Sequence, residues 1–424
     1  MLKHVRRHAT YANIVATLCL ISVVSGTAWA AATITGSQIK NNTITGKDVK
    51  NRSLTGSDIK SGVIPSYSAG DGLVKSGSQF SGKGTPYARV VVVAKSGGDY
   101  TSVQSAINSI TDEADDKRYL VWVAPGTYTE RVTTAAYIDV AGSGESTTTI
   151  QSTAGASASA GAVVTVGGTG TIRDLTISNR DAGGTHAVGL YALNKDAFTV
   201  RDVTIDVHEG TTQSDGIYLD ASGGTYKHVT VTTGNEAEAL AHGINLENGA
   251  DAELIDSDVT AEGLSCYGTR QNGSTSLTLT RSDVLCTGST SATGVGLVDG
   301  SGARLVDTSV MATNGLAAGD ATGLNAETGA GSFSLQNTKI VGLSGPAGTG
   351  QGVALGGVSA TLSVNASQLI GNTTGVNLMA ASTEVSIGGS LLIGGVSGAG
   401  LGSATVACAA SWDGGFTALN ASCA

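Results

Sequence analysis

The chain has 424 residues with a net charge of −10; 61 residues are glycine, 4 are proline, 14% are charged and 40% are hydrophobic. Glycine is about twice as frequent as its usual ~7%, which excludes a helical bundle. Charged residues are too few for a disordered chain, and prolines are too few for a collagen. The composition favours a large β protein with many tight turns.

Residues 1–30 have the pattern of a secretory signal peptide. Lys3, Arg6 and Arg7 precede an apolar stretch at residues 14–24, and the Ala-Trp-Ala of residues 28–30 resembles a cleavage site. The apolar stretch is too short for a transmembrane helix, and no other stretch of the sequence could serve as one. Cleavage would leave 21 basic and 34 acidic residues, a charge of −13, which argues against nucleic acid as a partner. We expect a protein that is secreted or held at the cell surface.

Residues 31–65 form a stalk of decapeptide repeats, and residues 66–88 read as a linker rich in glycine and serine. The copies TITGSQIKNN, TITGKDVKNR and SLTGSDIKSG place an apolar residue at every fifth position, which fits neither an α-helix nor a flat strand. This period is similar to that of pentapeptide-repeat solenoids, and similar decapeptides begin many exported actinobacterial proteins. We expect a spacer or a cap on the first coil; the alternative is contact between its basic residues and anionic cell-wall polymers.

Residues 89–407 carry an internal repeat whose period, about 27 residues, is typical of solenoid proteins. Strands such as TIRDLTI, TVRDVTI and TYKHVTV recur, and a second strand such as GIYLD or GINLE leads each unit. This pattern predicts an all-β fold, a single-stranded right-handed parallel β-helix of about eleven coils. The last apolar residues of the first strand set, which should stack inside, are Val123, Ile150, Ile177, Ile205, Val231, Val259, Val284, Val310, Ile340, Leu369 and Leu391.

Both ends of such a solenoid need a cover, because each exposes unpaired backbone. The apolar spacing of residues 103–110 predicts an N-terminal capping helix that begins with a capping box of Thr101 and Gln104. Residues 408–424 are predicted to form a C-terminal cap closed by a disulfide, with two aromatic residues as apolar lids.

Four cysteines follow the signal peptide, an even number for an oxidising compartment. They fall into two pairs that are close in the sequence, and this local spacing predicts the disulfides Cys266–Cys286 and Cys408–Cys423.

Residues 90–150 resemble the start of the pectinesterases, a family within the pectin-lyase-like superfamily of right-handed parallel β-helices. The resemblance rests on VVVAKSGGDYTSVQSAINSI, YLVWVAPGTYTERV and YIDVAGSGESTTTI, and GTYTE at residues 126–130 matches the family's G-x-Y-x-E element. It can be traced to about residue 260. In the family these early motifs build the cap and the first turns and carry no catalysis.

The resemblance places the family's catalytic motifs on later coils, and most of them are altered here. GTHAVGLYA resembles G-x-Q-A-V-A-L, with His186 in place of the oxyanion-binding Gln. SDGIYL resembles Q-D-T-L-Y-V, so Asp215 matches the general-acid Asp while Ser214 replaces the Gln before it. AHGINLENGA resembles V-D-F-I-F-G-N-A, with His242 in place of the nucleophilic Asp. The G-R-P-W motif is absent, and Arg270 comes too early to match its arginine.

His186, Asp215 and His242 are therefore the candidate catalytic residues. They are separated by about one coil each, so we expect them as rung neighbours about 5 Å apart. An Asp between two His raises the imidazole pKa and could poise one ring for acid–base catalysis. The same three side chains could instead hold a divalent metal, or form a polar ladder left from an ancestral site. Simple strand alternation places Asp215 inward, like Ile217 and Leu219, unless it still lies in the turn.

Two further ladders are candidates for substrate binding. The first consists of Tyr191, Asp220 and Glu247, and the second of Tyr218 and Asn245. Tyrosine rings and outward carboxylates are common sugar-contacting groups. The acidic face disfavours polygalacturonate, which is itself anionic, unless Ca²⁺ bridges the two.

Two functions stay open. The first is a structural or glycan-interacting module with a degenerate pectinesterase-like site; the second is a carbohydrate-active enzyme, an esterase or lyase of cell-wall polysaccharide. An outward cluster beside an open groove would favour the enzyme, and inward side chains would exclude it. In both cases we expect a monomer without a resident cofactor, whose partner is an extracellular polysaccharide or cell-wall polymer.

Overall fold

A computed structural model describes residues 87–413 with short gaps, residues 11–28, and parts of residues 37–82. The gaps after residue 87 are 154, 181–183, 209, 236, 316–317, 328, 330, 357–359, 380–383, 399–404 and 410. The chain divides into two compact units, Met1–Lys83 and Gly84–Ala424.

The N-terminal unit contains helix α2 (Tyr11–Ala28) and an antiparallel strand pair, β1 (Leu73–Ser76) and β2 (Gln79–Gly82). Helix α2 covers the apolar stretch of the expected signal peptide, whose cleavage site lies outside the described residues. In the part of the chain that is described, no helix is long and apolar enough to cross a membrane. The strand pair lies inside residues 66–88, where the sequence predicted only a linker.

The decapeptide stalk is described only in part. Thr43 and Ser53, one repeat apart, donate from their hydroxyls to the carbonyls of Lys40 and Lys50, over 2.6 and 2.7 Å. The same turn thus recurs at the same place in two successive repeats.

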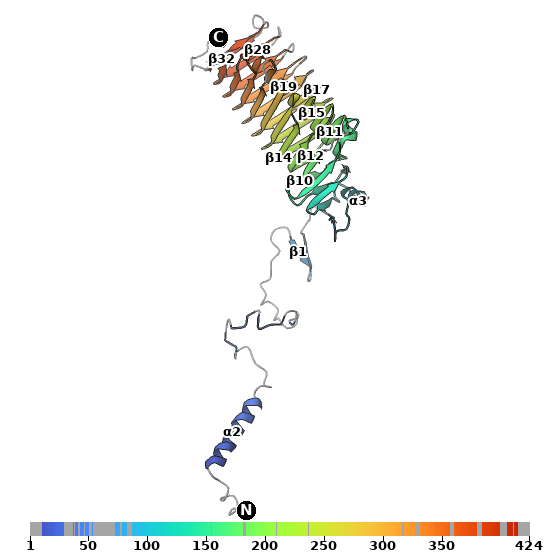
Figure 1. The fold of residues 1–424 in the computed structure, drawn as a ribbon, viewed down its shortest axis with the longest axis vertical. Coiled ribbons are helices and arrows are strands. Elements are labelled where there is room, and N and C mark those ends of the chain that lie inside the picture. The colour runs from blue at the N-terminus through green and yellow to red at the C-terminus, as the bar shows by residue number, and fades with distance from the viewer. Residues whose placement is uncertain are drawn as a thin grey trace, which may run out of the picture. The chain divides into compact units, whose positions relative to one another are not determined.

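From Arg89 to Asp413 the second unit is a parallel β-solenoid of about eleven turns (Figure 1). Each complete turn contributes strand segments to three sheets, which we name A, B and C in chain order. Several long strands bend at a corner and contribute to two sheets. The all-β solenoid predicted from the sequence period is confirmed.

The strands of the three sheets are as follows. Sheet A contains β6 (Val132–Thr133), β9 (Ala162–Val166), β11 (His186–Leu193), β13 (Gln213–Asp220), β15 (Leu240–Glu247), β22 (Asp320–Ala326), β25 (Gly350–Leu355), β28 (Thr374–Leu378) and β31 (Val396–Ser397). Sheet B contains β3 (Arg89–Val93), β4 (Tyr119–Val123), β7 (Ile138–Ala141), β16 (Asp251–Ile255), β18 (Ser276–Thr280), β20 (Gly302–Val306), β23 (Ser332–Gln336), β26 (Thr361–Asn365), β29 (Glu384–Gly388) and β32 (Thr405–Ala409). Sheet C contains β5 (Gly126–Thr129), β8 (Thr148–Ser152), β21 (Ser309–Asn314), β24 (Lys339–Leu343), β27 (Gln368–Gly371), β30 (Leu391–Ile393) and β33 (Trp412–Asp413). Sheets B and C share β10 (Thr171–Asn179), β12 (Phe198–Val207) and β14 (Gly223–Gly234), while sheets C and A share β17 (Asp258–Asn272) and β19 (Asp283–Val298).

One inward column of sheet C tests the predicted repeat residue by residue. The nine predicted residues from Ile150 to Leu369 pair in register on successive coils and are at most 2% exposed. The prediction is wrong at both ends of the column. Tyr128, not Val123, precedes Ile150, and Leu392, not Leu391, follows Leu369. Val123 pairs with Val93 in sheet B instead.

Sheet A carries a column of glycines that breaks the strand alternation. A Cβ added at Gly216 would point into the core, 2.2 Å from Cγ1 of Val231 and 2.6 Å from the carbonyl oxygen of Gly243. The next residue, Ile217, is also fully buried in the core. Two successive residues therefore face inward, so the residue before the glycine, Asp215, faces outward. The glycines at this position are Gly189, Gly216, Gly243, Gly268, Gly294, Gly323, Gly352 and Gly375.

The front of the solenoid is covered by helix α3 (Val103–Asn108), as predicted, although its capping differs. Ser102, not Thr101, is the N-cap and accepts a hydrogen bond from the backbone N–H of Ser105. The carboxylate of Glu130 accepts from the N–H groups of Val103 and Gln104 at 2.8 and 3.0 Å. The last residue of the GTYTE element thus caps the helix N-terminus, which is a structural role.

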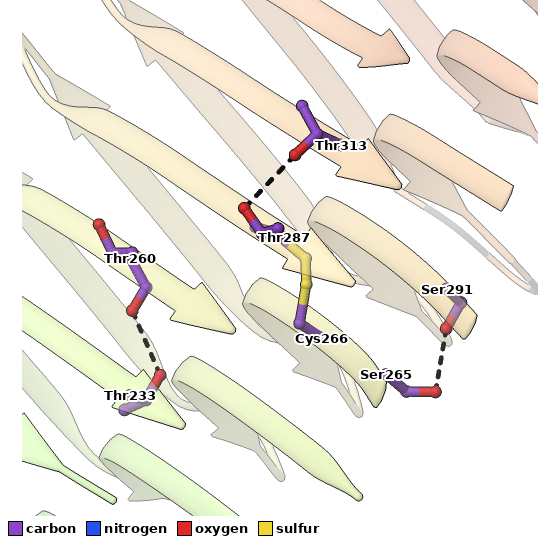
Figure 2. The surroundings of a disulfide bond; sticks show 8 residues. Thr233, Thr260, Ser265, Cys266, Thr287, Ser291 and Thr313 are labelled. Atoms are coloured by element: carbon purple, nitrogen blue, oxygen red, sulfur yellow. Dashed lines mark hydrogen bonds between the residues drawn. A yellow bond between two sulfur atoms is a disulfide. The ribbon is translucent and has the colours of Figure 1, made fainter. Parts of the chain in front are cut away.

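The inner corner between sheets C and A is filled by small side chains and a disulfide. Cys266 and Cys286 are bonded as predicted, with their Cα atoms 5.9 Å apart (Figure 2). They belong to a buried cluster whose other members are all alanine. Cys408 is also disulfide-bonded, while its predicted partner Cys423 lies outside the described residues. The solenoid ladder runs through the strands β32 and β33, so it continues past residue 408, where the sequence predicted the cap to begin.

Candidate functional site

The three candidate catalytic residues lie on neighbouring strands of sheet A, but they do not form a single row. Asp215 on β13 is directly opposite His242 on β15. His186 on β11 is opposite Gln213, two residues before Asp215, and it is Val188 that pairs with Asp215. The predicted row of three is therefore wrong at His186, because one full coil from His186 ends at Gln213 and not at Asp215. His186 reaches Asp215 diagonally instead.

The three side chains are on the outer face of sheet A. Simple alternation predicted that Asp215 would point inward, and the glycine break after Asp215 overturns that expectation. The outer face is nevertheless closed at this point: the side chain of Asp215 is 0% exposed, that of His242 2% and that of His186 23%. Helix α4 (Ala158–Gly161) and the ring of Tyr191 pack over Val188 beside them.

Asp215 is surrounded by nitrogen groups. Nδ1 of His242 lies 2.7 Å from Oδ1 of Asp215, and Nε2 of His186 lies 3.5 Å from Oδ2. The side-chain amide of Gln213 donates to both carboxylate oxygens, at 3.0 and 2.9 Å. With the Nδ1 proton of His242 directed at Asp215, its Nε2 is buried and has no hydrogen-bond partner among the described residues.

These contacts keep Asp215 ionised. Burial by itself would raise the pKa of the carboxyl, but the two imidazoles, the charge of His242 and the Gln213 amide outweigh burial and lower the pKa to about 2. At neutral pH the cluster is therefore a buried carboxylate held between two histidines. In this form Asp215 accepts hydrogen bonds and holds no proton of its own.

The predicted sugar-binding residues form two outer rows beside the cluster, and one residue lies in the other row from the one predicted. Tyr191, Tyr218 and Asn245 share one row, and Asp220 pairs with Glu247 in the next. Tyr191 thus belongs with Tyr218, not with the two carboxylates. The rings of Tyr191 and Tyr218 are 5.6 Å apart and tilted by 41°.

Tyr218 is half-buried and close to several carboxylates. Burial raises the pKa of its hydroxyl, and the charges of Glu247, Asp215 and Asp220 raise it further. The phenol therefore stays protonated, and can donate a hydrogen bond, over the whole physiological range.

Three further residues complete the surface, and sequence reasoning gave none of them a role. Gln213 holds Asp215 and could have been found by counting one repeat length from His186. The ring of Tyr267 on β17 lies 5.5 Å from that of His242. Arg270 on the same strand forms an ion pair with Glu247 at 2.7 Å and donates to Asn245 over 3.3 Å.

The described residues contain no group of three His, Cys, Asp or Glu side chains arranged to hold a metal ion. The divalent metal at His186, Asp215 and His242 stays a prediction that an experiment must decide. Three surface hollows of about 280, 300 and 260 Å³ lie over sheets B and C, and none is lined by these residues.

The candidate site lies in a part of the sequence that matches a known protein family. Residues 89–257 match the pectinesterase family. The match confirms the resemblance found in the sequence. His186, Asp215 and His242 all lie inside the pectinesterase-like stretch, whereas Cys266, Tyr267 and Arg270 lie beyond it. No curated protein matches the sequence of the chain.

Several solved structures are similar in fold. A pectin methylesterase, PemA from Erwinia chrysanthemi, is 15% identical and aligns over 53% of this chain and 79% of its own, with a TM-score of 0.36. The pectin methylesterase from Aspergillus niger is 16% identical over 73% of this chain and 86% of its own, with a TM-score of 0.36. The pectate lyase Pel9A is 14% identical over 78% and 82%, with a TM-score of 0.46. Similarity at this level does not extend to the chemistry of the site.

Proposed function

We propose that this protein is a secreted or cell-surface β-helix that binds glycan on the outer face of sheet A through a degenerate pectinesterase-like site. Secretion is supported by the signal-peptide pattern of residues 1–30. Glycan binding is supported by the pectinesterase match and by the tyrosine, asparagine and carboxylate rows over residues 191–247.

The observation that carries this proposal is the state of Asp215. It is the one residue that matches a catalytic group of the pectinesterases, and it is fully buried, ionised and bound to Gln213 and His242. The carboxylate cannot contact a polysaccharide without displacing these partners, and it carries no proton at neutral pH. The cluster therefore acts as a rigid support that positions the outer rows of sheet A.

A polysaccharide screen of the purified protein tests this function. We expect binding without turnover: no methanol from methylated pectin, no new reducing ends and no unsaturated products, with or without Ca²⁺, Zn²⁺ or a chelator. Tyr218→Ala should weaken glycan binding about tenfold or more, since a tyrosine platform is lost. Trp122→Ala, at an exposed aromatic residue of sheet B, is the matched control and should bind as the wild type does. Failure of the protein to bind any glycan would overturn the proposal.

One observation favours the enzyme as a second candidate. Asp215 holds His242 in the tautomer that leaves Nε2 without a proton, which is the arrangement of a general base. If the protein is an esterase or lyase, turnover will be found in the screen and lost in the variant His186→Ala/His242→Ala. Turnover that requires an added metal would assign the same residues to a metal site.

A further inference from the structure

The outer face of sheet C changes character along the solenoid. One outward row begins with the polar residues Gln151, Ser178, Asp206, Thr232 and Thr260. Its continuation on the next coils is aliphatic, and we call it the apolar row: Leu285, Met311, Val341, Ile370 and Ile393.

The residues of the apolar row point away from the core. Each follows a core residue of the inward column, such as Val310 before Met311, and side chains alternate along a strand. Leu285, Met311 and Ile370 are partly exposed, Val341 is buried, and Ile393 is 36% exposed. Five rungs at about 4.8 Å make a stripe roughly 19 Å long. Four of the five rungs present exposed apolar surface, interrupted at Val341, and apolar residues gathered in this way indicate an interaction site.

The neighbouring row carries charges that suit a second copy of the same stripe. Two residues before the apolar row lie Asp283, Ser309 and Lys339 on successive coils. Asp283 and Lys339 are exposed, stand two rungs apart, and have no ion-pair partner among the described residues. They therefore present one negative and one positive group, about 10 Å apart, on either side of Ser309.

We propose that this face of sheet C is the interface of a symmetric dimer of the chain. A two-fold axis that lies in the interface, parallel to the strands and level with Met311, keeps each row opposite itself and reverses the order of the coils. Asp283 of one copy then lies opposite Lys339 of the other, and this pairing occurs twice. Met311 meets its own counterpart and Leu285 faces the rung of the buried Val341, while Ile370 and Ile393 lie opposite Thr260 and Thr232 of the other copy.

The charges select this register over its neighbours. An axis level with Val341, the centre of the apolar row, would bring the two copies of Lys339 together, which like-charge repulsion disfavours. The stripe is smaller than the ~800 Å² per partner of a standard stable interface, so the dimer is weak, with a Kd in the micromolar range. This dimer would replace the monomer expected from the sequence.

Sedimentation equilibrium of the purified protein from about 1 to about 200 µM tests the proposal. We expect a concentration-dependent dimer whose Kd rises at least tenfold in Met311→Lys, because two lysines then meet at the axis. Thr278→Lys, on the outer face of sheet B and outside the proposed interface, is the matched control and should leave the Kd unchanged. Circular dichroism and thermal unfolding of each variant show whether it is folded.

Charge reversal tests the register. Asp283→Lys and Lys339→Asp should each raise the Kd about 3–10-fold, and the double variant should restore it, because the two-fold then pairs the reversed charges. A monomer at every concentration, or a dimer insensitive to Met311→Lys, would overturn the proposal. If the wild type is monomeric and Met311→Lys lowers its thermal stability, the chain's own residues cover the apolar row, and this result would also overturn the proposal. A dimer that the double variant does not restore would overturn the two-fold register.

Discussion

The front coils, residues 186–272, and the back coils, residues 283–393, share one core but differ in the outer face that carries distinctive side chains. In the front coils sheet A carries the ionised cluster and the tyrosines on its outer face, while the outer row of sheet C is polar. In the back coils the row that contains Asp215 and His242 continues with uncharged polar residues, three threonines and Gln351, and one outer row of sheet C becomes apolar. The core columns run through both halves without a break.

This difference shows how a solenoid separates fold from function. Inward residues must match the coil above and the coil below, so they stay mostly apolar along the whole length. Outward residues have no such constraint and can change within one coil. The family match ends at residue 257, close to the point where sheet A loses its ionisable residues.

The largest effect should come from a feature that both halves share, the glycine column. Gly243→Ala in the front half and Gly294→Ala in the back half would place a Cβ 2.2 and 2.3 Å from a core valine. We expect each variant to lose more than about 4 kcal/mol of unfolding free energy, or to fail to fold. Urea unfolding measures this, and Gly315→Ala, where the added Cβ meets nothing within 4 Å, is the control. Tolerance of one of the two variants would show that the two halves differ in their core.

The disulfide lies at the junction of the two halves. Cys266→Ala/Cys286→Ala should lower the unfolding free energy by about 3 kcal/mol, because the bridge closes a loop with a sequence separation of 20. The two introduced alanines match the other residues of this corner, so the substitution buries no polar group. Urea unfolding without a reducing agent measures this difference, because a reducing agent would also break the bridge of Cys408, which the variant retains. Equal unfolding curves of the wild type and the variant would show that the bridge adds no stability.

Asp215 distinguishes the front half by its pH dependence. Its pKa is about 2 in the folded protein against an ordinary value of 3.8. The ionised carboxylate therefore contributes stability above about pH 4, and that contribution is lost as the pH falls through about 2. Asp215→Asn should be about 2–3 kcal/mol less stable than the wild type at pH 7, with a difference that shrinks toward pH 2. Thr293→Val, on the same row of the back half, should show no such trend; equal pH profiles for the wild type and Asp215→Asn would refute the stabilisation of the buried carboxylate by its hydrogen bonds.

The smallest effect concerns the front cap. Glu130→Gln weakens two hydrogen bonds to the N-terminus of α3 and removes a charge from it, at a cost of about 1 kcal/mol. Because each coil contacts only its neighbours, faster hydrogen exchange should appear in α3 and the first coils and not in the back coils. Exchange that rises equally along the whole solenoid would mean that the two halves unfold as one unit.

The architecture could be read from the sequence because inward aliphatic residues repeat once per coil. Nine positions of one column were predicted in the correct register, and the errors at Val123 and Leu391 lie at the ends. Val123 stands a full repeat before Ile150, but this first coil is shorter, 22 residues from Tyr128 to Ile150, so Val123 falls on sheet B. The disulfide between Cys266 and Cys286 followed from local spacing alone.

The site was harder to predict because it depends on loop length and on the glycine break. The three candidate residues do meet, but the length of the coil between them puts Gln213, and not Asp215, beside His186. Alternation would have turned Asp215 inward, and only the steric conflict at Gly216 shows that it faces outward. The burial of Asp215 depends on Gln213, His186 and His242, whose side chains surround its carboxylate and whose identities no periodicity encodes.

The glycine column also bears on how such a protein changes over time. The residue before each glycine is directed outward by the backbone itself, whatever its side chain, because the break in alternation lies in the core. On successive coils this one place is occupied by Val188, Asp215, His242, Tyr267, Thr293 and Thr322. A single codon change there replaces the chemistry of one coil and leaves every stacking contact intact. New surfaces can therefore be acquired on this scaffold, and old ones lost, one coil at a time.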